Sequence, residues 1–370
     1  MMTFFKVQLI FSLLLGWSIN PTLVYISLFI GVLTIYFRKI SFNLVAGIFT
    51  VATLLWMLIQ LIFGYDYITF ANKEVTVLSY VLLILTIFIF ISSMRRDEEL
   101  FYFISAFCIG ISAKNLFIAF YNMSIPGKTG YGSIINPLTN VAMNSPGVSI
   151  KLALSSGLYI YILFSDRSLK MKLFSIMMIT SCIFSAVFLE GRTFFIIITM
   201  YFIFNIVYSY ISILKKIAMG VGVLFFMIGY YIYALIDSGI LARFTELGIK
   251  SNRFSHWLHA IDNFDYYYFG GLETNKSFEN TQWFHNILID TYRLSGIIGF
   301  VLILIIFIVG VMYCKSRTLL SDSLFYTSLI FSCILVMLQD VIFEGYFEVF
   351  VVFYMTVLAV MKTNNNLIRN

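Results

Sequence analysis

All three histidines of this chain lie in one polar stretch of an otherwise strongly apolar sequence. The stretch runs from 241 to 299, and its residues best suited to chemistry are Arg253, His256, Trp257, His259, His285 and Arg293. An imidazole titrates near neutral pH and can take a proton from a hydroxyl group. A guanidinium binds phosphate or carboxylate oxygens through two parallel hydrogen bonds. These residue types predict acid–base chemistry on a hydroxyl beside an anion-binding site.

His285 is the strongest candidate for a catalytic base. It stands where the polar stretch meets a long apolar run, so we expect its imidazole at the water–membrane boundary. On a helix of 3.6 residues per turn, His285 shares a face with Tyr292, and Asn286, Asp290 and Arg293 lie on the neighbouring face. Asp290 and Arg293 are spaced for an ion pair. The alternative interpretation is an interfacial histidine without a catalytic role.

Two further features of the stretch suggest ligand contact. Arg253 and Trp257 stand four residues apart and share a face of a predicted amphipathic helix. Gly270 and Gly271 permit positive φ angles and a close approach of the backbone to a ligand. The alternatives are an interfacial helix with an aromatic anchor and an ordinary turn.

A second group of charges lies earlier in the chain. Glu190, Gly191 and Arg192 form a tight turn between two apolar runs, so Arg192 could hold an anion with Glu190 tuning it. Lys114 and Lys151 stand toward the ends of apolar runs and could line a path for an anion. The alternative is that these side chains reach the water interface without binding a ligand.

Composition indicates the elements that position these residues. The chain of 370 residues is 61% hydrophobic and 11% charged, against about 45–50% and about 25% in soluble domains. Apolar runs of about 20 residues recur along it, which predicts an all-α, polytopic transmembrane helix bundle of about twelve spans. We expect these spans near 3–17, 21–37, 42–63, 75–94, 99–121, 147–164, 171–189, 193–213, 217–236, 285–313, 320–339 and 345–361.

The loops between these runs indicate an orientation. Basic residues recur in alternate loops, at Arg38-Lys39, Arg95-Arg96, Arg167 to Lys172, Lys215-Lys216, Lys315 to Arg317 and in the tail with Lys362. By the positive-inside rule these loops, and both termini, are cytoplasmic. The expected organisation is a bundle of about nine spans over 1–237, a large extracytoplasmic loop over 238–284, and about three spans over 285–370. The other outer segment, 122–145, is either a flexible lid or a connector.

Several classes of protein are disfavoured. The net charge of +6 comes from loop residues that orient spans, so no nucleic-acid partner is expected. The sequence holds no G-x-x-x-x-G-K-[ST] motif for nucleotide phosphates. His256 and His259 are three residues apart, whereas a helical metal pair is usually four apart, so no metal is expected. The four cysteines lie in apolar runs and are expected to be core residues rather than disulfides.

Four features together resemble the bacterial O-antigen polymerase and O-antigen ligase superfamily. They are the turn with Arg192, the outer loop with Arg253-x-x-x-Trp257, the glycine pair, and His285-Asn286 leading into Gly296-Ile-Ile-Gly299. The resemblance covers roughly residues 185–300, and in the N-terminal half it rests on span number and topology. Many members carry an acid near the place of Arg293; Asp290 could substitute for it, or Arg293 could be a third phosphate contact.

The resemblance implies glycosyl transfer at the outer face of the bacterial cytoplasmic (inner) membrane. The donor and the acceptor would be glycans on undecaprenyl pyrophosphate, joined into O-antigen or capsular polysaccharide. Arg192 and Arg253 match the family's basic positions and would bind pyrophosphate; His285 matches its histidine and would activate the acceptor hydroxyl. The reaction would be inverting and independent of metals and cofactors. Partners would be membrane lipid and a chain-length regulator and flippase of the same pathway.

Three alternatives remain open at this point, and one of them is a noncatalytic assembly partner in the envelope. Within the same chemistry, an O-antigen ligase would transfer the glycan to lipid A core instead. In a different class, a flippase would move lipid-linked oligosaccharides, although it needs polar groups distributed through a central cavity and here they cluster at the outer face.

Overall fold

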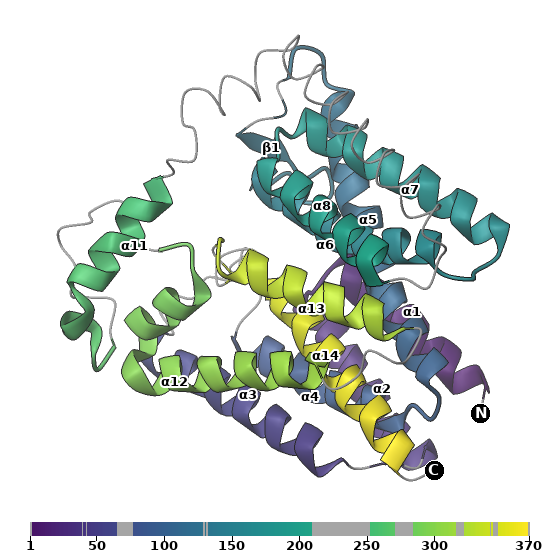
Figure 1. Cartoon of the computed structure of the whole chain (residues 1–370), viewed down its shortest axis with the longest axis horizontal. Coiled ribbons are helices and arrows are strands. Elements are labelled where there is room, and N and C mark those ends of the chain that lie inside the picture. The colour runs from purple at the N-terminus through teal and green to yellow at the C-terminus, as the bar shows by residue number, and fades with distance from the viewer. Residues whose placement is uncertain are drawn as a thin grey trace. The chain divides into compact units, whose positions relative to one another are not determined.

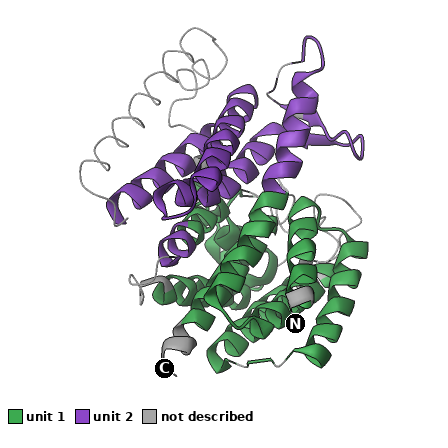
Figure 2. Cartoon of the chain, turned by 90° about the vertical axis from the view of Figure 1, so that its right-hand side faces the viewer, with its two compact units in different colours: residues 1–110, 253–319, 329–370 green, residues 111–252, 320–328 purple. Residues whose placement is uncertain are grey.

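A computed structural model shows an almost entirely helical protein. The structure describes residues 2–38, 40–41, 43–64, 77–128, 130, 132–208, 252–270, 284–315, 322–340, 342 and 347–368. The chain divides into two compact units (Figure 2). Unit 1 consists of Met1–Gly110, Arg253–Leu319 and Leu329–Asn370, and unit 2 of Ile111–Asn252 and Leu320–Ser328.

Unit 1 is a helical bundle built from both ends of the chain (Figure 1). Among its helices, α3 packs against α4, α12 and α14, and α4 packs against α2. Buried aromatic rings fill the centre, where Trp56 of α3 lies 4.9 Å from Phe350 of α14 between ring centroids. The helices are α1 (Met2–Trp17), α2 (Pro21–Phe37), α3 (Leu44–Gly64), α4 (Val77–Ser93), the first half of α5 (Asp97–Met123), α11 (Asn252–Asp262), the 3-10 helix η1 (Phe264–Tyr267), α12 (Ile287–Lys315), most of α13 (Ser323–Met337) and α14 (Phe347–Ile368).

Local sequence explains where several of these helices begin and how they approach. Asn20 accepts a hydrogen bond from the Leu23 amide at 2.9 Å, and Pro21 occupies the first turn, which together begin α2. Helices α1 and α5 cross at Gly16 and Gly110. A Cβ at Gly16 would overlap the Phe107 carbonyl, so glycine is what allows these two backbones to meet.

Unit 2 is centred on α6 (Ser145–Phe164), which packs against α7 (Leu169–Phe188) and α8 (Arg192–Tyr208) and is buried along nearly its whole length. The loop predicted at 122–145 contains a two-stranded antiparallel ribbon, β1 (Ser133–Ile135) and β2 (Ala142–Asn144). The Asn122 side chain at the end of α5 holds this ribbon through hydrogen bonds of 2.7 and 2.9 Å to the Ile135 backbone.

The structure supports a membrane protein. Over the residues that the structure describes, every apolar run predicted as a span coincides with a helix; the end of 193–213 and the whole of 217–236 lie outside them. Four described helices are long and apolar enough to cross a membrane: Asp97–Met123, Ser145–Phe164, Leu169–Phe188 and Ile287–Tyr313. Six more apolar helices are shorter. The number of spans and the large outer loop stay predictions.

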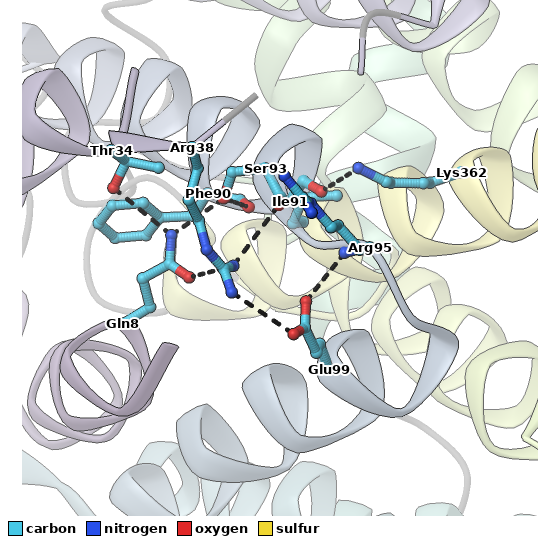
Figure 3. A network of polar contacts seen from close by, with 9 residues as sticks. All are labelled: Gln8, Thr34, Arg38, Phe90, Ile91, Ser93, Arg95, Glu99 and Lys362. Carbon is cyan, nitrogen blue, oxygen red and sulfur yellow. Dashed lines mark hydrogen bonds and ion pairs between the residues drawn. The ribbon is translucent and has the colours of Figure 1, made fainter. Parts of the chain in front are cut away.

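A network of buried polar groups closes one end of unit 1 (Figure 3). Arg38, at the end of α2, donates to Gln8 at 3.2 Å and lies 3.5 Å from Glu99 of α5. Glu99 also accepts the Arg95 backbone N–H at 2.8 Å, which fixes the turn between α4 and α5. The network therefore joins α1, the end of α2 and the start of α5.

Lys362 of α14 completes this network. Its ammonium donates to the Ile91 and Ser92 carbonyls at 2.8 and 2.6 Å and to the Ser41 hydroxyl at 2.9 Å. Carbonyls in the last turn of a helix have no partner within the helix, and a cation there also complements the helix dipole. Arg38, Arg95 and Lys362, all predicted on the cytoplasmic side, thus meet at the same end of unit 1.

Helix α3 connects this end to the other. Near its start, Asn43 donates to the Met361 carbonyl of α14 at 3.0 Å, beside the Lys362 network. Near its end, Gln60 donates to Ser295 of α12 at 2.7 Å. At about 1.5 Å per residue the two contacts are about 25 Å apart, which approaches the ~30 Å hydrocarbon thickness of a bilayer.

Candidate functional site

His285 occupies a strained turn at the end of unit 1 that is opposite the Lys362 network. Its φ is +57°, a left-handed conformation that is uncommon for a residue with a side chain. The Asp290 carboxylate fixes this turn by accepting the Phe284 amide at 2.7 Å and the Asn286 amide at 3.1 Å. Asp290 is fully buried. A buried carboxylate on the first turn of α12 therefore dictates where the His285 backbone lies.

Asn286 links the same turn to the segment that follows α13. Its side-chain oxygen accepts the Leu288 amide at 3.0 Å and caps α12, and its amide group donates to the Leu338 carbonyl at 3.1 Å. The second bond brings Asp340 to His285. The His285 Nδ1 lies 3.9 Å from the Asp340 Oδ1, and the imidazole is 31% exposed whereas the carboxylate is 5% exposed.

The other two histidines stand on α11, and His256 interacts electrostatically with both His285 and His259. Partial burial lowers the pKa of His256, and the neighbouring imidazoles of His285 and His259 lower it further. We call His256, His259 and His285 the histidine cluster. Trp257 attaches α11 to this place, because its indole N–H donates to the Phe284 carbonyl at 2.8 Å. The helix predicted around 255–259 is confirmed as α11.

The structure corrects the expected helical face of His285. Helix α12 begins at Ile287, so His285 lies before the helix and does not share a face with Tyr292. Tyr292 is buried, its ring stacks on Phe264 at 4.1 Å between centroids, and its hydroxyl donates to the Phe264 carbonyl at 2.7 Å. Tyr292 thus holds η1 against α12.

The α12 region is also not one continuous helix. Gly296 interrupts it with φ +64° and ψ −159°, and the Ile297 amide donates instead to the Tyr268 carbonyl at 3.1 Å. Gly270, with φ +78°, lies against this break, where its Cβ would come 2.6 Å from the Leu294 carbonyl oxygen. The positive φ predicted for Gly270 is confirmed. The backbone that it approaches is that of Gly296, and Gly271 lies outside the described residues.

Arg293 is less exposed to solvent than expected for a side chain that contacts a phosphate directly. Its guanidinium lies over the Phe284 ring, with 5.1 Å between Cζ and the ring centroid, and the residue is 5% exposed. A buried cation against Phe284, the residue before His285, raises the local electrostatic potential and attracts an anion. Asp290 directs its carboxylate to the two backbone amides, so the expected Asp290–Arg293 partnership is not its main contact.

The remaining predicted residues are distributed as follows. Arg253 lies in the first turn of α11, in unit 1. Glu190, with φ +51°, and Arg192 form the turn between α7 and α8 in unit 2, and a Cβ at Gly191 would overlap the Ser149 side chain of α6. Lys151, on α6, is buried, and Lys114, on α5, is half-buried; both also belong to unit 2.

No group of three metal-ligating side chains occurs among the described residues. Cys108, Cys182 and Cys333 are buried free thiols.

Comparison with protein-family models finds no match to this chain. Comparison with curated proteins finds none either.

Sequence reasoning missed Asp340. It stands far along the chain from His285, just after an apolar run, and in the sequence it looks like a loop charge. The signal that could have identified it is its place at the same end of the bundle as His285. A carboxylate at an expected outer helix end is a candidate partner for a histidine there.

Proposed function

We propose that the chain is a membrane glycosyltransferase that joins undecaprenyl-pyrophosphate-linked oligosaccharide repeat units into O-antigen or capsular polysaccharide. The observation that carries the proposal is a partly exposed imidazole, His285, held in a fixed turn beside a buried guanidinium. It lies toward the end of the helical bundle opposite the Lys362 network, because the α3 contacts beside that network and beside α12 are about 25 Å apart.

The position of this imidazole supports the choice of substrate. A polyprenyl chain lies in the bilayer, and its pyrophosphate lies at the membrane surface. His285 precedes the candidate span Ile287–Tyr313 by two residues, which supports a position at that same surface. A soluble sugar nucleotide would require no such placement. The Arg38, Arg95 and Lys362 network lies at the opposite end, in keeping with an outer position for His285.

The reaction balances without a cofactor. The acceptor hydroxyl oxygen attacks the anomeric carbon of the donor, a new glycosidic C–O bond forms, and the bond from that carbon to the pyrophosphate oxygen breaks. The pyrophosphate leaves with the electron pair, and His285 takes the hydroxyl proton. Positive charge from Arg253 and Arg293 would stabilise the negative charge that develops on the leaving group. Direct displacement inverts the anomeric centre. The pyrophosphate contact predicted for Arg192 stays a prediction.

The test is transfer in vitro. Purified protein in nanodiscs would receive lipid-linked repeat units extracted from host cells that lack it. We expect a ladder of lengthening lipid-linked glycans from the native protein and from His259→Gln, and none from His285→Gln. His259 is the matched control, because it is also a histidine and its ring lies 3.3 Å from the side chain of Asn263, just past the end of α11.

Other outcomes distinguish the alternatives. Transfer only after lipid A core is added would assign the chain to the ligase reaction. Transport of the lipid-linked units across the bilayer that persists in His285→Gln, with no transfer, would contradict the proposal and favour a flippase.

A further inference from the structure

We propose that Asp340 is the positioning residue of the transferase, orienting His285 so that Nε2 is the atom that receives the acceptor proton. This inference rests on the proposed function for its catalytic meaning. The assignment of Asp340 itself follows from the geometry of unit 1.

Two independent restraints bring the pair together. Asp290 fixes the His285 backbone through the amides on either side of it. Asn286, the next residue, donates to the Leu338 carbonyl at 3.1 Å and so fixes the turn that carries Asp340. These hydrogen bonds to the backbone fix the positions of His285 and Asp340, and the Nδ1 atom of His285 points toward the Asp340 carboxylate.

Asp340 and His285 differ in solvent exposure, and this difference indicates a different role for each. Asp340 is nearly buried, at 5% exposed, so substrate does not reach its carboxylate directly. His285 is 31% exposed, which leaves part of its ring accessible. With Nδ1 directed at Asp340, the nitrogen on the far side of the ring is Nε2. A proton on Nδ1 leaves the Nε2 lone pair available to a hydroxyl.

The surrounding charges explain why such a carboxylate is useful. Arg293 of α12 lies against the ring of Phe284, the residue before His285, so a positive charge that forms on the imidazole there is stabilised by a nearby carboxylate. Asp290 is occupied by two amides. When His285 takes the proton from the acceptor hydroxyl, Asp340 stabilises the imidazolium, and the proton remains on His285. The present separation of 3.9 Å would shorten in that step, as catalytic hydrogen bonds do when the reacting complex forms.

The first experiment reads the tautomer directly and needs no turnover. The chain contains three histidines, so protein labelled with 15N-histidine gives few imidazole signals, which His256→Gln and His259→Gln assign. Above neutral pH we expect the His285 proton on Nδ1 in the native protein. In Asp340→Asn we expect a shift toward the Nε2–H form that free imidazole favours in water. A proton on Nε2 in the native protein, or no change in the variant, would overturn the assignment.

The second experiment measures transfer. Asp340→Asn should lower kcat by about 10- to 100-fold, part of the 10²–10⁴-fold that a positioned base supplies, with KM within about 2-fold. Asp340→Glu, one methylene longer, should recover most of kcat. Asp265→Asn makes the same chemical change on an exposed carboxylate of η1 and should leave kcat unchanged.

These readouts separate the two ideas. Native protein with the expected tautomer but no transfer activity would sink the proposed function and leave the His285–Asp340 assignment standing. Equal loss of kcat in Asp340→Asn and Asp340→Glu, with an unchanged tautomer, would show that Asp340 only supports the fold.

Discussion

The contact between Gly270 and the break in α12 predicts a large and specific effect of one methyl group. In Gly270→Ala, a left-handed backbone at φ +78° costs about 1–2 kcal/mol. The new Cβ would meet three backbone groups, at 2.6, 2.7 and 2.9 Å, and forcing them apart costs about 1–3 kcal/mol. Displacing η1 also weakens the bond from Ile297 to Tyr268, worth about 1 kcal/mol. The expected loss of stability is about 3–6 kcal/mol.

Gly127→Ala is the matched control. Gly127 has a similar φ of +71°, but nothing lies within 4 Å of the added Cβ. Only the strain of the left-handed backbone therefore destabilises this variant. The free energy of unfolding in mixed micelles should therefore differ between the two variants by about 2–4 kcal/mol. Hydrogen exchange adds a local reading, since the Ile297 amide should lose protection in Gly270→Ala alone. Equal stability of the two variants would refute the role of the backbone contact.

Three further predictions concern charged groups of unit 1. Lys362→Met should lower the free energy of unfolding by about 2–4 kcal/mol, because two buried helix-end carbonyls lose a charged donor. The control is Lys170→Met at an exposed position. An equal loss of stability in the two variants would contradict a stabilising role for the Lys362 contacts. Asp290→Ala should lower the free energy of unfolding by about 2–4 kcal/mol, because two buried amides lose their acceptor. Asp262→Ala, on the exposed end of α11, is the control and should change it little; unfolding in mixed micelles measures both variants. The pKa of His256 is lowered in the folded protein, so the unfolded chain binds more protons as pH falls below about 6.5 and stability decreases there. His256→Gln should flatten the dependence of the unfolding midpoint between about pH 5 and 7, and an unchanged slope would contradict the assignment.

The long helices could be predicted from the sequence because each carries a continuous apolar run. The run predicted at 21–37 matches α2, whose start has the Asn20 and Pro21 signals of a helix N-terminus. The amphipathic spacing around His256 and Trp257 likewise predicts α11. Such patterns are local, so the sequence alone is enough to locate them.

The partners of the site could not be predicted in the same way. Asp290 stands three residues before Arg293, which suggests an ion pair, but the left-handed turn at His285 exposes two amides that take the carboxylate instead. The meeting of His285 with Asp340 depends on how the turn after α13 packs, and no periodicity records that. Gly270 signals a positive φ without indicating that Gly296 is its neighbour.

The contacts of Lys362 also bear on how the protein is made. Lys362 is synthesised 271 residues after Ile91, whose carbonyl it covers. At about 5–20 residues per second, translation of the intervening chain takes roughly 15–50 s. Throughout that interval the carbonyls at the end of α4 lack the Lys362 ammonium, and the early helices of unit 1 are in the membrane without α14. A ribosome that stalls before Lys362 would therefore leave an incomplete bundle whose exposed helix end gives quality-control proteases a feature by which to distinguish it from the finished protein.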